Sequence, residues 1–514
     1  MPASPGWRIL TEGGAEAKHG VAGTEENAPR TEPGIEAAPR LTRAQYIVLG
    51  IAALAFFMEQ VDTTSLNTAI PSIALDFGVV PISLNVAVTS YILALAAGIP
   101  LTGWMADRFG ARRVFACAMG CFGLASLLCG LSDSLATLVL TRTLQGLAGS
   151  MMSPVGRLLV LRILPRPLLS SGLALMAIPA LVGPALGPVL GGALSEYVSW
   201  RWIFFINVPV AVLGIISVIR VVPEVPSLPA GRLDLAGFLY CAAGLVAAQF
   251  TLETVGRDAL PLWSQVAGGL VTLAALGAYL RHTRHRDEPL LDLMVFRRRT
   301  FRVAINAGGV ARIGIQAMPF LIPLFLQLGL GMSPLRAGVW AATTSIGAIS
   351  IRAVTALILS KLGFDRMLLL ASSMAGVVIC LFALIGHDNA AYLLPVLLIA
   401  YGLARSFHLS TNSTLGFSDM PGRLLSNANT ISTVMQQLTQ SFGISLAAIL
   451  LSVIAGGATP GQGTFSIVFA VMGCFPLLAV LGFLRLRPQD GAVASRHPRA
   501  LAALNPGRRG SERG

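Results

Sequence analysis

The sequence predicts an all-α polytopic membrane protein with fourteen transmembrane helices, and three observations support this fold class. Hydrophobic residues make up 54% of the chain and charged residues only 12%, and the mean hydropathy of +0.73 lies far above that of soluble domains. The apolar stretches are continuous runs, without the alternation that membrane barrel strands show. The basic residues gather in alternate loops between these runs.

The apolar runs have the length of membrane-spanning helices. A helix that crosses a hydrocarbon core of about 30 Å needs about 20 mostly apolar residues. Scanning with that length gives spans centred near residues 57, 92, 122, 148, 182, 211, 243, 272, 315, 346, 376, 402, 440 and 475. If the amino terminus is placed in the cytoplasm, nearly all arginines in the loops between the spans lie on the cytoplasmic side. The exceptions on the outer side are Arg201, Arg257 and Arg336. Both termini are therefore predicted to be cytoplasmic.

The spans divide into groups of six, two and six. Residues 1–43 are rich in Gly, Ala, Pro and Glu and are predicted to form a disordered cytoplasmic tail. Residues 44–222 hold a six-helix bundle, residues 223–299 hold two linker helices and a cytoplasmic loop, and residues 300–487 hold a second six-helix bundle. Residues 488–514 are predicted to be a second disordered cytoplasmic tail.

Several function classes lack their motifs. The six cysteines stand in apolar stretches without metal-like spacing, and the chain has no phosphate-binding loop, zinc motif or nucleophile elbow. We therefore expect no enzymatic activity, no catalytic residue, no metal site and no cofactor. The net charge of +13 is explained by arginines in cytoplasmic loops, so nucleic acid is not an expected partner.

The first apolar run contains two carboxylates, Glu59 and Asp62, in a place where ionisable groups are costly and usually functional. They are three residues apart and share one helix face, and Asn67 follows on the same run. A structural alternative is that Asp62 and Asn67 only satisfy the backbones of neighbouring helices.

The fourth run contains Arg142 and Gln145. Arg142 and Asp62 are expected at similar depth, a short way inside the outer ends of their helices, so we expect Arg142 to interact with Asp62 or Glu59, directly or through water. Protonation of the acid would then compete with the arginine or with a substrate, which is a physical route to proton coupling. The alternative is a static salt bridge between helices.

The second half carries buried cations instead of acids. Arg312 and Arg405 lie in apolar runs, and no acid lies in the apolar part of a second-half span. This predicts a positive second-half cavity that faces a negative first-half cavity, with Gln316, His408 and Gln436 as further polar candidates. The alternative is that the two arginines bond to backbone carbonyls.

A polar hairpin separates the second and third runs, with Gly103, Asp107, Arg108, Gly110 and Arg112 as its notable residues. The glycines permit close backbone approach and a sharp turn, and Asp107 can cap or pair across the hairpin. A weaker copy follows the second span of the second half, where Gly363 aligns with Gly110.

The fifth run carries glycines at four-residue spacing, which form a smooth stripe that lets another helix approach closely. Its prolines each remove a backbone hydrogen bond, which predicts a kinked and tightly packed helix. The residues are Gly183, Pro184, Gly187, Pro188, Gly191 and Gly192.

Together these stretches resemble the motifs of the major facilitator superfamily, and in particular its drug/proton antiporters with fourteen helices. The hairpin at residues 103–113 resembles motif A, the segment around Asp62 resembles motif D1, residues 140–149 resemble motif B and residues 183–192 resemble motif C. The resemblance implies two six-helix bundles that rock around a midplane site, with two inserted central helices.

The resemblance also implies a function and a place in the cell. It implies a proton-coupled exporter of amphipathic small molecules or drugs in a bacterial inner membrane, with protons carried by Asp62 and Glu59 beside Arg142. The expected partners are the small-molecule substrate, protons, the lipid bilayer and, as a candidate, a periplasmic adaptor protein. One alternative is a dedicated exporter of an anionic or zwitterionic metabolite, such as a carboxylate siderophore, because of Arg312 and Arg405. Another is a membrane sensor or scaffold that does not transport.

Overall fold

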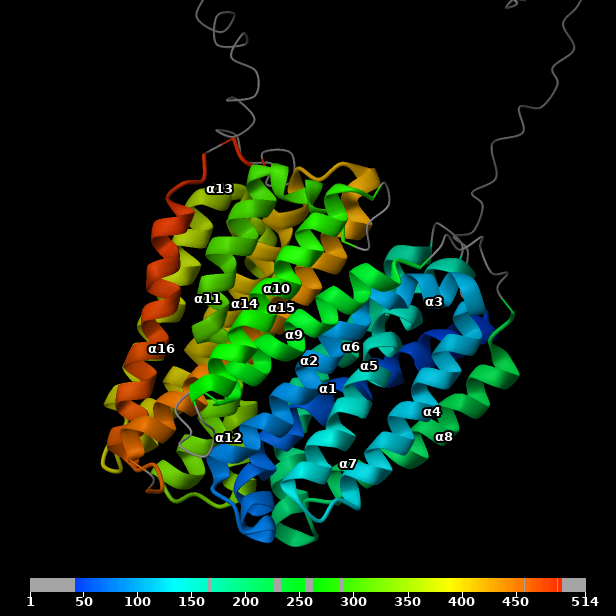
Figure 1. Cartoon of the computed structure of the whole chain (residues 1–514). Helices are drawn as coiled ribbons and strands as arrows, with labels where there is room; N and C mark the ends of the chain where they lie inside the picture. Colours follow the sequence, from blue (N-terminus) through cyan, green and yellow to red (C-terminus); the bar gives the residue numbers. More distant parts are fainter. Residues whose placement is uncertain are drawn as a thin grey trace, which may run out of the picture. The chain divides into compact units, whose positions relative to one another are not determined.

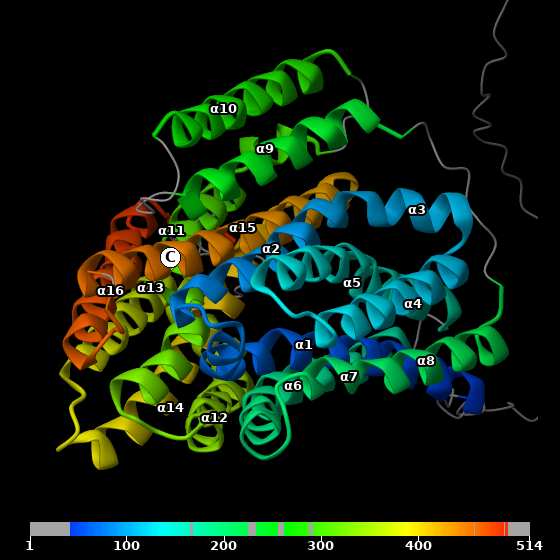
Figure 2. The ribbon, with the colours of Figure 1, turned by 60° about the horizontal axis from the view of Figure 1, so that its bottom comes forward.

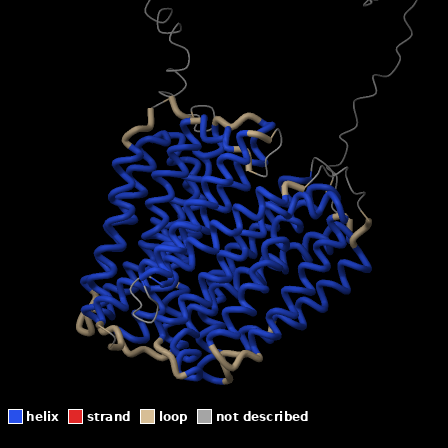
Figure 3. The backbone as a smooth tube through the Cα atoms, in the orientation of Figure 1, coloured by secondary structure: helices blue, strands red, loops and turns tan. Residues whose placement is uncertain are grey.

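The computed structural model describes residues 42–164, 168–224, 233–254, 262–286, 291–456, 458–487 and 489–491. All regular elements in these ranges are helices (Figure 3). Residues Leu41–Gly514 form one compact unit. The predicted tails, residues 1–43 and 488–514, lie almost entirely outside the described residues.

The first bundle contains the helices expected from the first six apolar runs. They are α1 (Arg43–Phe77), α2 (Asn85–Gly98) continued by α3 (Thr102–Phe109), α4 (Ala111–Gly130), α5 (Leu135–Ile163), α6 (Leu169–Tyr197), and α7 (Trp202–Phe205) continued by α8 (Asn207–Val221). Thr42 begins α1 with a capping box to Gln45. Gly78 ends it in the left-handed conformation, with its N–H bonded to the carbonyl of Ala74.

The linker helices and the second bundle follow. They are α9 (Leu235–Thr254), α10 (Leu262–Arg284), α11 (Arg299–Leu324), α12 (Pro334–Ala342), α13 (Thr344–Leu381), α14 (Ala390–Ser418), α15 (Gly422–Ala455) and α16 (Gln462–Phe483). A π-helical turn, Phe325–Gly329, follows two prolines at the end of α11. The long α13 holds two predicted spans, and its backbone breaks at Gly363.

Ten helices in the described part of the chain are long and apolar enough to cross a membrane. All fourteen predicted centres fall inside helices, but α5, α6, α9 and the first half of α13 are not among the ten. The all-helical multi-pass fold is confirmed, and the count of fourteen spans stays a prediction.

The hairpin between α2 and α4 differs from its prediction in one respect. Residues predicted as a loop from Gly103 onward form α3, and a side chain at Gly103 would meet no atom within 4 Å, so no close approach occurs there. The turn is made by Gly110 alone, with φ of 87°. Gly363 has φ of 78° at the matching place in the second half, which confirms the aligned pair of turns.

Helices from the two bundles meet along a seam. The helix α2 packs against α15, α6 packs against α12, and α1 approaches α11. The linker helix α9 lies against α2 and α15, and α10 lies outside α9 (Figures 1 and 2). Gln249 of α9 joins α15 by bonds with the hydroxyls of Ser441, at 2.7 Å, and Ser445, at 3.1 Å. The inserted pair is therefore central in the sequence but peripheral in space.

Candidate functional site

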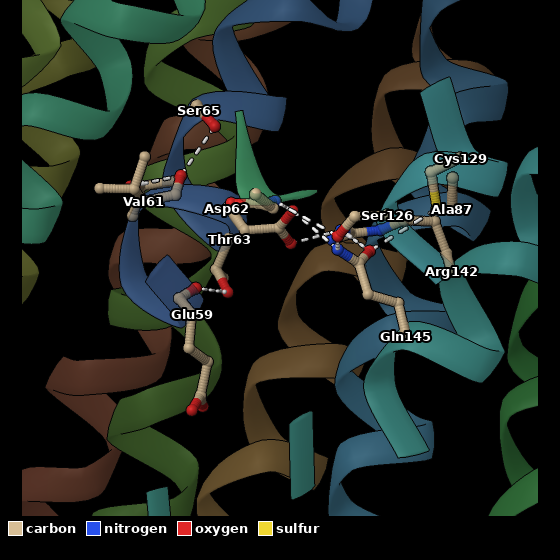
Figure 4. Close-up of polar contacts among 12 residues, drawn as sticks. Glu59, Val61, Asp62, Thr63, Ser65, Ala87, Ser126, Cys129, Arg142 and Gln145 are labelled. Carbon is tan, nitrogen blue, oxygen red and sulfur yellow. Dashed lines mark hydrogen bonds and ion pairs between the residues drawn. The ribbon is translucent and has the colours of Figure 1, made fainter. Parts of the chain in front are cut away.

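A buried ion pair joins α1 to α5. One Arg142 guanidinium nitrogen lies 2.5 Å from Asp62 Oδ2, and the two side chains are 1% and 0% exposed. The Arg142 guanidinium also lies over the ring of Tyr91, 4.2 Å from its centroid. The predicted contact between Arg142 and Asp62 is therefore confirmed (Figure 4). However, α1 continues to Phe77, so Asp62 lies near the middle of its helix and not near its outer end.

Neutral polar groups from α5 and from two further helices, α4 and α8, complete the surroundings of Asp62. Gln145 Nε2 donates to Asp62 Oδ1 at 2.9 Å, and Asn207 Nδ2 donates to the same oxygen at 3.0 Å. Both amides also donate to Ser126 Oγ, at 2.7 and 3.3 Å. We call Asp62, Ser126, Arg142, Gln145 and Asn207 the Asp62 network. It compensates a buried charge pair with well-formed hydrogen bonds across α1, α4, α5 and α8, which a stable buried pair requires.

Glu59 lies one turn away on α1 and has different surroundings. Its side chain is half-buried, and it accepts a hydrogen bond from Ser153 Oγ of α5. No basic side chain pairs with it among the described residues. Figure 4 shows its carboxylate pointing away from the Asp62 network. Of the two acids, Asp62 is the one that Arg142 binds.

A cavity of about 340 Å³ lies at the seam between the bundles and is walled by both. The first bundle supplies α1, α2 and α6, and the second supplies α11 to α15. Its charged lining residues are Glu59 and Arg405, which come from opposite bundles. The remaining lining residues are neutral. The polar ones include Thr63, Asn67, Gln316, Gln436 and Gln440. The apolar ones include Ile92, Leu95, Ile322 and Leu409.

Four of the predicted cavity residues line this cavity: Asn67, Gln316, Arg405 and Gln436. An Arg405 guanidinium nitrogen donates to Gln316 Oε1 at 3.4 Å, and Gln316 Nε2 donates to Gln440 Oε1 at 3.3 Å. A chain of amides therefore holds the Arg405 side chain at the wall of the cavity.

Three predicted cavity residues lie elsewhere. Gln145 belongs to the Asp62 network, Arg312 is 2% exposed inside the second bundle, and His408 is 0% exposed with Nδ1 3.0 Å from Ser372 Oγ. Arg312 and His408 are buried away from the cavity because α11 and α14 pack closely beyond it, where Gly308 lies against Asn412.

The glycine stripe of α6 lies directly against the polar face of α1. A Cβ at Gly183 would lie 2.6 Å from the Cβ of Gln60, and one at Gly187 would meet Thr64 Oγ1. The close helix approach predicted from the spacing is confirmed. Gly191 continues the stripe against the carbonyl of Ser65, whereas Gly192 faces α12 at Pro334. The stripe brings Pro184 and Pro188 to the cavity wall.

The charged residues of the hairpin tie the first bundle together at the predicted cytoplasmic side. Asp107 Oδ1 lies 2.6 Å from a guanidinium nitrogen of Arg162 on α5. Arg112 donates to the carbonyl of Ile219 at the end of α8 and lies 3.9 Å from Glu224. Arg108 is exposed and has no ion pair in the part of the chain that the structure describes.

Sequence reasoning missed Tyr91, Ser126 and Asn207 as parts of the site. Asn207 offered a signal, because it is a lone amide in an apolar run that follows an aromatic segment. Ser126 offered none, since a single serine in a membrane helix usually bonds to its own backbone.

Comparison with known proteins agrees with this architecture. A family model described as Major Facilitator Superfamily matches residues 52–444. The chain belongs to the Major Facilitator Superfamily. It is thus a multi-pass membrane protein of a transporter family, and the family resemblance of its motifs is confirmed.

Within the superfamily, the chain is similar to proteins named "Putative multidrug resistance protein MdtD". It is 36% identical over 470 residues to the one from Citrobacter koseri, covering 90% of this chain and 99% of that protein. It is 39% identical over 405 residues to the one from Klebsiella pneumoniae, covering 78% and 85%.

Solved structures of two transporters have the same fold. A D-xylose-proton symporter matches with a TM-score of 0.62 at 15% identity, over 87% of this chain and 99% of that one. The nucleoside transporter NupG matches with a TM-score of 0.62 at 12% identity, over 87% and 100%.

Proposed function

We propose that this protein is a proton-coupled exporter that exchanges protons for amphipathic small molecules by alternating access. One observation carries the proposal: Glu59 faces a cavity that both bundles wall, and it stands one turn from the buried Asp62 network on the same helix. The names of the MdtD relatives support a drug-like substrate.

In the proposed mechanism, Glu59 is the acid that meets the substrate. A cationic amphipath that enters the cavity displaces the proton from Glu59 and pairs with the carboxylate that remains. When the substrate leaves on the outer side, a proton binds Glu59 again and neutralises its carboxylate for the return. Asp62 is held by Arg142, and we propose that it exchanges its proton only when bundle movement opens the network.

The lining of the cavity suits amphipathic molecules. Its volume of about 340 Å³ falls within the range of small-molecule sites. Glutamine amides and threonine hydroxyls offer both donors and acceptors, and branched apolar side chains and prolines contact hydrocarbon groups. Such a surface binds varied polar heads without requiring one geometry.

A second candidate is export of an anionic or zwitterionic metabolite. The observation that favours it is Arg405, which lines the cavity and has a buried Nε without a hydrogen-bond partner. A substrate carboxylate would supply that partner. In this reading Glu59 binds the positive group of a zwitterion or carries only the proton.

The test is proton flux in proteoliposomes loaded with the purified chain under an imposed pH gradient. The probes are tetraphenylphosphonium and tetraphenylborate, which have the same shape and opposite charge, together with a zwitterionic amphipath. Proton movement triggered by a probe in the wild type and lost in Glu59→Gln supports antiport, and the active probe identifies the charge class. Full probe movement against its gradient in Glu59→Gln would refute the assignment of coupling to Glu59. No flux with any probe would count against export of drug-like molecules and would favour the dedicated-metabolite hypothesis or a role without transport.

A further inference from the structure

A second cavity lies between the start of α11 and the end of α16, on the predicted cytoplasmic side, and shares no lining residue with the cavity at the seam. It encloses about 740 Å³. Its rim carries four arginines, Arg299, Arg302, Arg485 and Arg487, and its remaining walls are apolar except for Asn306. We call it the α11–α16 groove. It plays no part in the transport mechanism proposed above.

One of the four arginines has its charge partner within the protein. Arg299 Nε lies 3.5 Å from Asp490 Oδ2, and its guanidinium also donates to the carbonyl of Arg485. The same carboxylate oxygen of Asp490 accepts the backbone N–H of Arg487 at 2.8 Å. Asp490 therefore holds the segment after α16 against the start of α11.

The other three guanidinium groups remain available. Arg302, Arg485 and Arg487 are exposed, and none has an ion pair among the described residues. Three unpaired cations around one groove attract a multivalent anion more strongly than a scattered set would.

The walls of the groove are suited to hydrocarbon. Val310, Leu478 and Leu481 are 36%, 56% and 64% exposed on helices that are long and apolar enough to span the membrane. This side of the two helices therefore contacts acyl chains. A free phosphate would use the arginine rim only, whereas a phospholipid uses the rim and the walls together.

We propose that the α11–α16 groove binds an anionic phospholipid, with its phosphate groups on Arg302, Arg485 and Arg487 and an acyl chain along Val310, Leu478 and Leu481. Basic pockets between membrane helices on the cytoplasmic side have the chemistry that recognises such headgroups. The bound lipid would bridge the first and last helices of the second bundle.

The experiment is native mass spectrometry of the full detergent-purified chain, titrated with phosphatidylglycerol, phosphatidylethanolamine or inorganic phosphate. The test variant combines Arg302→Gln, Arg485→Gln and Arg487→Gln. The matched control removes three exposed cytoplasmic-side arginines outside the groove: Arg220→Gln, Arg281→Gln and Arg284→Gln. We expect phosphatidylglycerol to bind the wild type and the control alike, and the test variant about tenfold or more weakly, given the contribution of each basic residue at a lipid surface.

Other outcomes would overturn the proposal. An equal loss in the control variant would mean that net charge alone governs binding, and equal binding of phosphatidylethanolamine would remove the need for an anionic headgroup. Displacement of the lipid by inorganic phosphate at similar concentration would assign the site to a free anion. If the test variant fails to fold, Leu481→Trp fills the groove without changing charge, and unchanged lipid binding by that variant would contradict the proposal.

Discussion

At Asp62, a buried carboxylate and a buried guanidinium depend on each other. Asp62→Asn leaves Arg142 as an uncompensated charge in the interior, and breaking such a pair typically costs about 3–5 kcal/mol. We expect this variant to lose coupled transport and also to unfold at a lower temperature, which thermal unfolding in detergent will measure.

The matched control for this prediction is the double variant Asp62→Asn with Arg142→Gln. Removing both charges eliminates the unpaired cation, so we expect the double variant to recover much of the lost stability without recovering transport. A double variant that is less stable than Asp62→Asn would show that the unpaired charge of Arg142 is not the main cause of the stability lost in Asp62→Asn.

The cavity charges give a second prediction at the residue scale. Arg405→Gln removes the cation that lines the cavity but leaves Glu59 in place. Tetraphenylborate has no hydrogen-bond acceptor, so Arg405 attracts it only by charge, which is worth about 1–4 kcal/mol at about 4 Å for effective dielectric constants between about 80 and 20. We therefore expect tetraphenylborate to bind the variant about tenfold more weakly. Binding of tetraphenylphosphonium should be retained, and calorimetric titration of both probes measures the difference. An equal loss for both probes would indicate a collapsed cavity.

At the scale of elements, the contact between α6 and α1 controls the shape of the site. Gly187→Leu places a side chain where Thr64 Oγ1 already lies, and its Cβ would be 3.3 Å from the backbone nitrogen of Ser65. Overpacking of this kind typically costs about 1–3 kcal/mol. We expect lower abundance in the membrane and a lower unfolding temperature.

The control for this element is Gly277→Leu on α10, where an added Cβ meets nothing within 4 Å. It makes the same change in a membrane helix that has space for it. If both variants lose stability equally, hydrophobic bulk in general is responsible and the close contact of α6 with α1 is not.

At the scale of the whole molecule, the bundles are held together at the end opposite the predicted cytoplasmic side. There Gln327 Nε2 donates to the carbonyl of Thr68 at 2.9 Å, and the Leu335 N–H donates to Glu196 Oε2 at 2.8 Å. Gly338 of α12 lies against the backbone of Pro188 on α6. In Figure 1 the helices of the two bundles diverge from this end, as expected for a state that is closed on the predicted outer side.

Gly338→Val should loosen this closure, because its Cβ would lie 2.9 Å from the carbonyl carbon of Pro188. We expect faster hydrogen exchange in peptides that cover the outer ends of α6 and α12, measured by mass spectrometry on the full chain. Gly463→Val on α16, where a Cβ meets nothing within 4 Å, is the control. Equal exchange in Gly338→Val and the wild type would mean that this contact does not hold the outer end closed.

The sequence was most informative where the chemistry of single residues is extreme. Acids and an arginine in apolar helices are so costly in a membrane that a contact of Arg142 with Asp62 or Glu59 could be predicted. The sequence did not decide between the two acids, and the predicted depth of Asp62 was wrong. Glycines at four-residue spacing predicted the contact of α6, because only a close neighbour makes such a stripe useful.

The rest depended on which helix faces meet, and a single sequence does not contain that information. Arg312 and Arg405 look alike in the sequence, yet only Arg405 reaches the cavity, because α11 and α14 close together at Gly308. The composition of the linker helices α9 and α10 does not set them apart from the other predicted spans. Their position outside the seam follows from packing between segments that are distant in the sequence, such as α9 with α2 and α15.

The central claim is that substrate and proton compete for Glu59, and proton release on binding tests it most directly. The purified chain in detergent and weakly buffered solution is mixed with tetraphenylphosphonium while the pH is recorded, and binding is measured in parallel. The account predicts proton release from the wild type and binding without proton release in Glu59→Gln. Equal proton release from both proteins would contradict it.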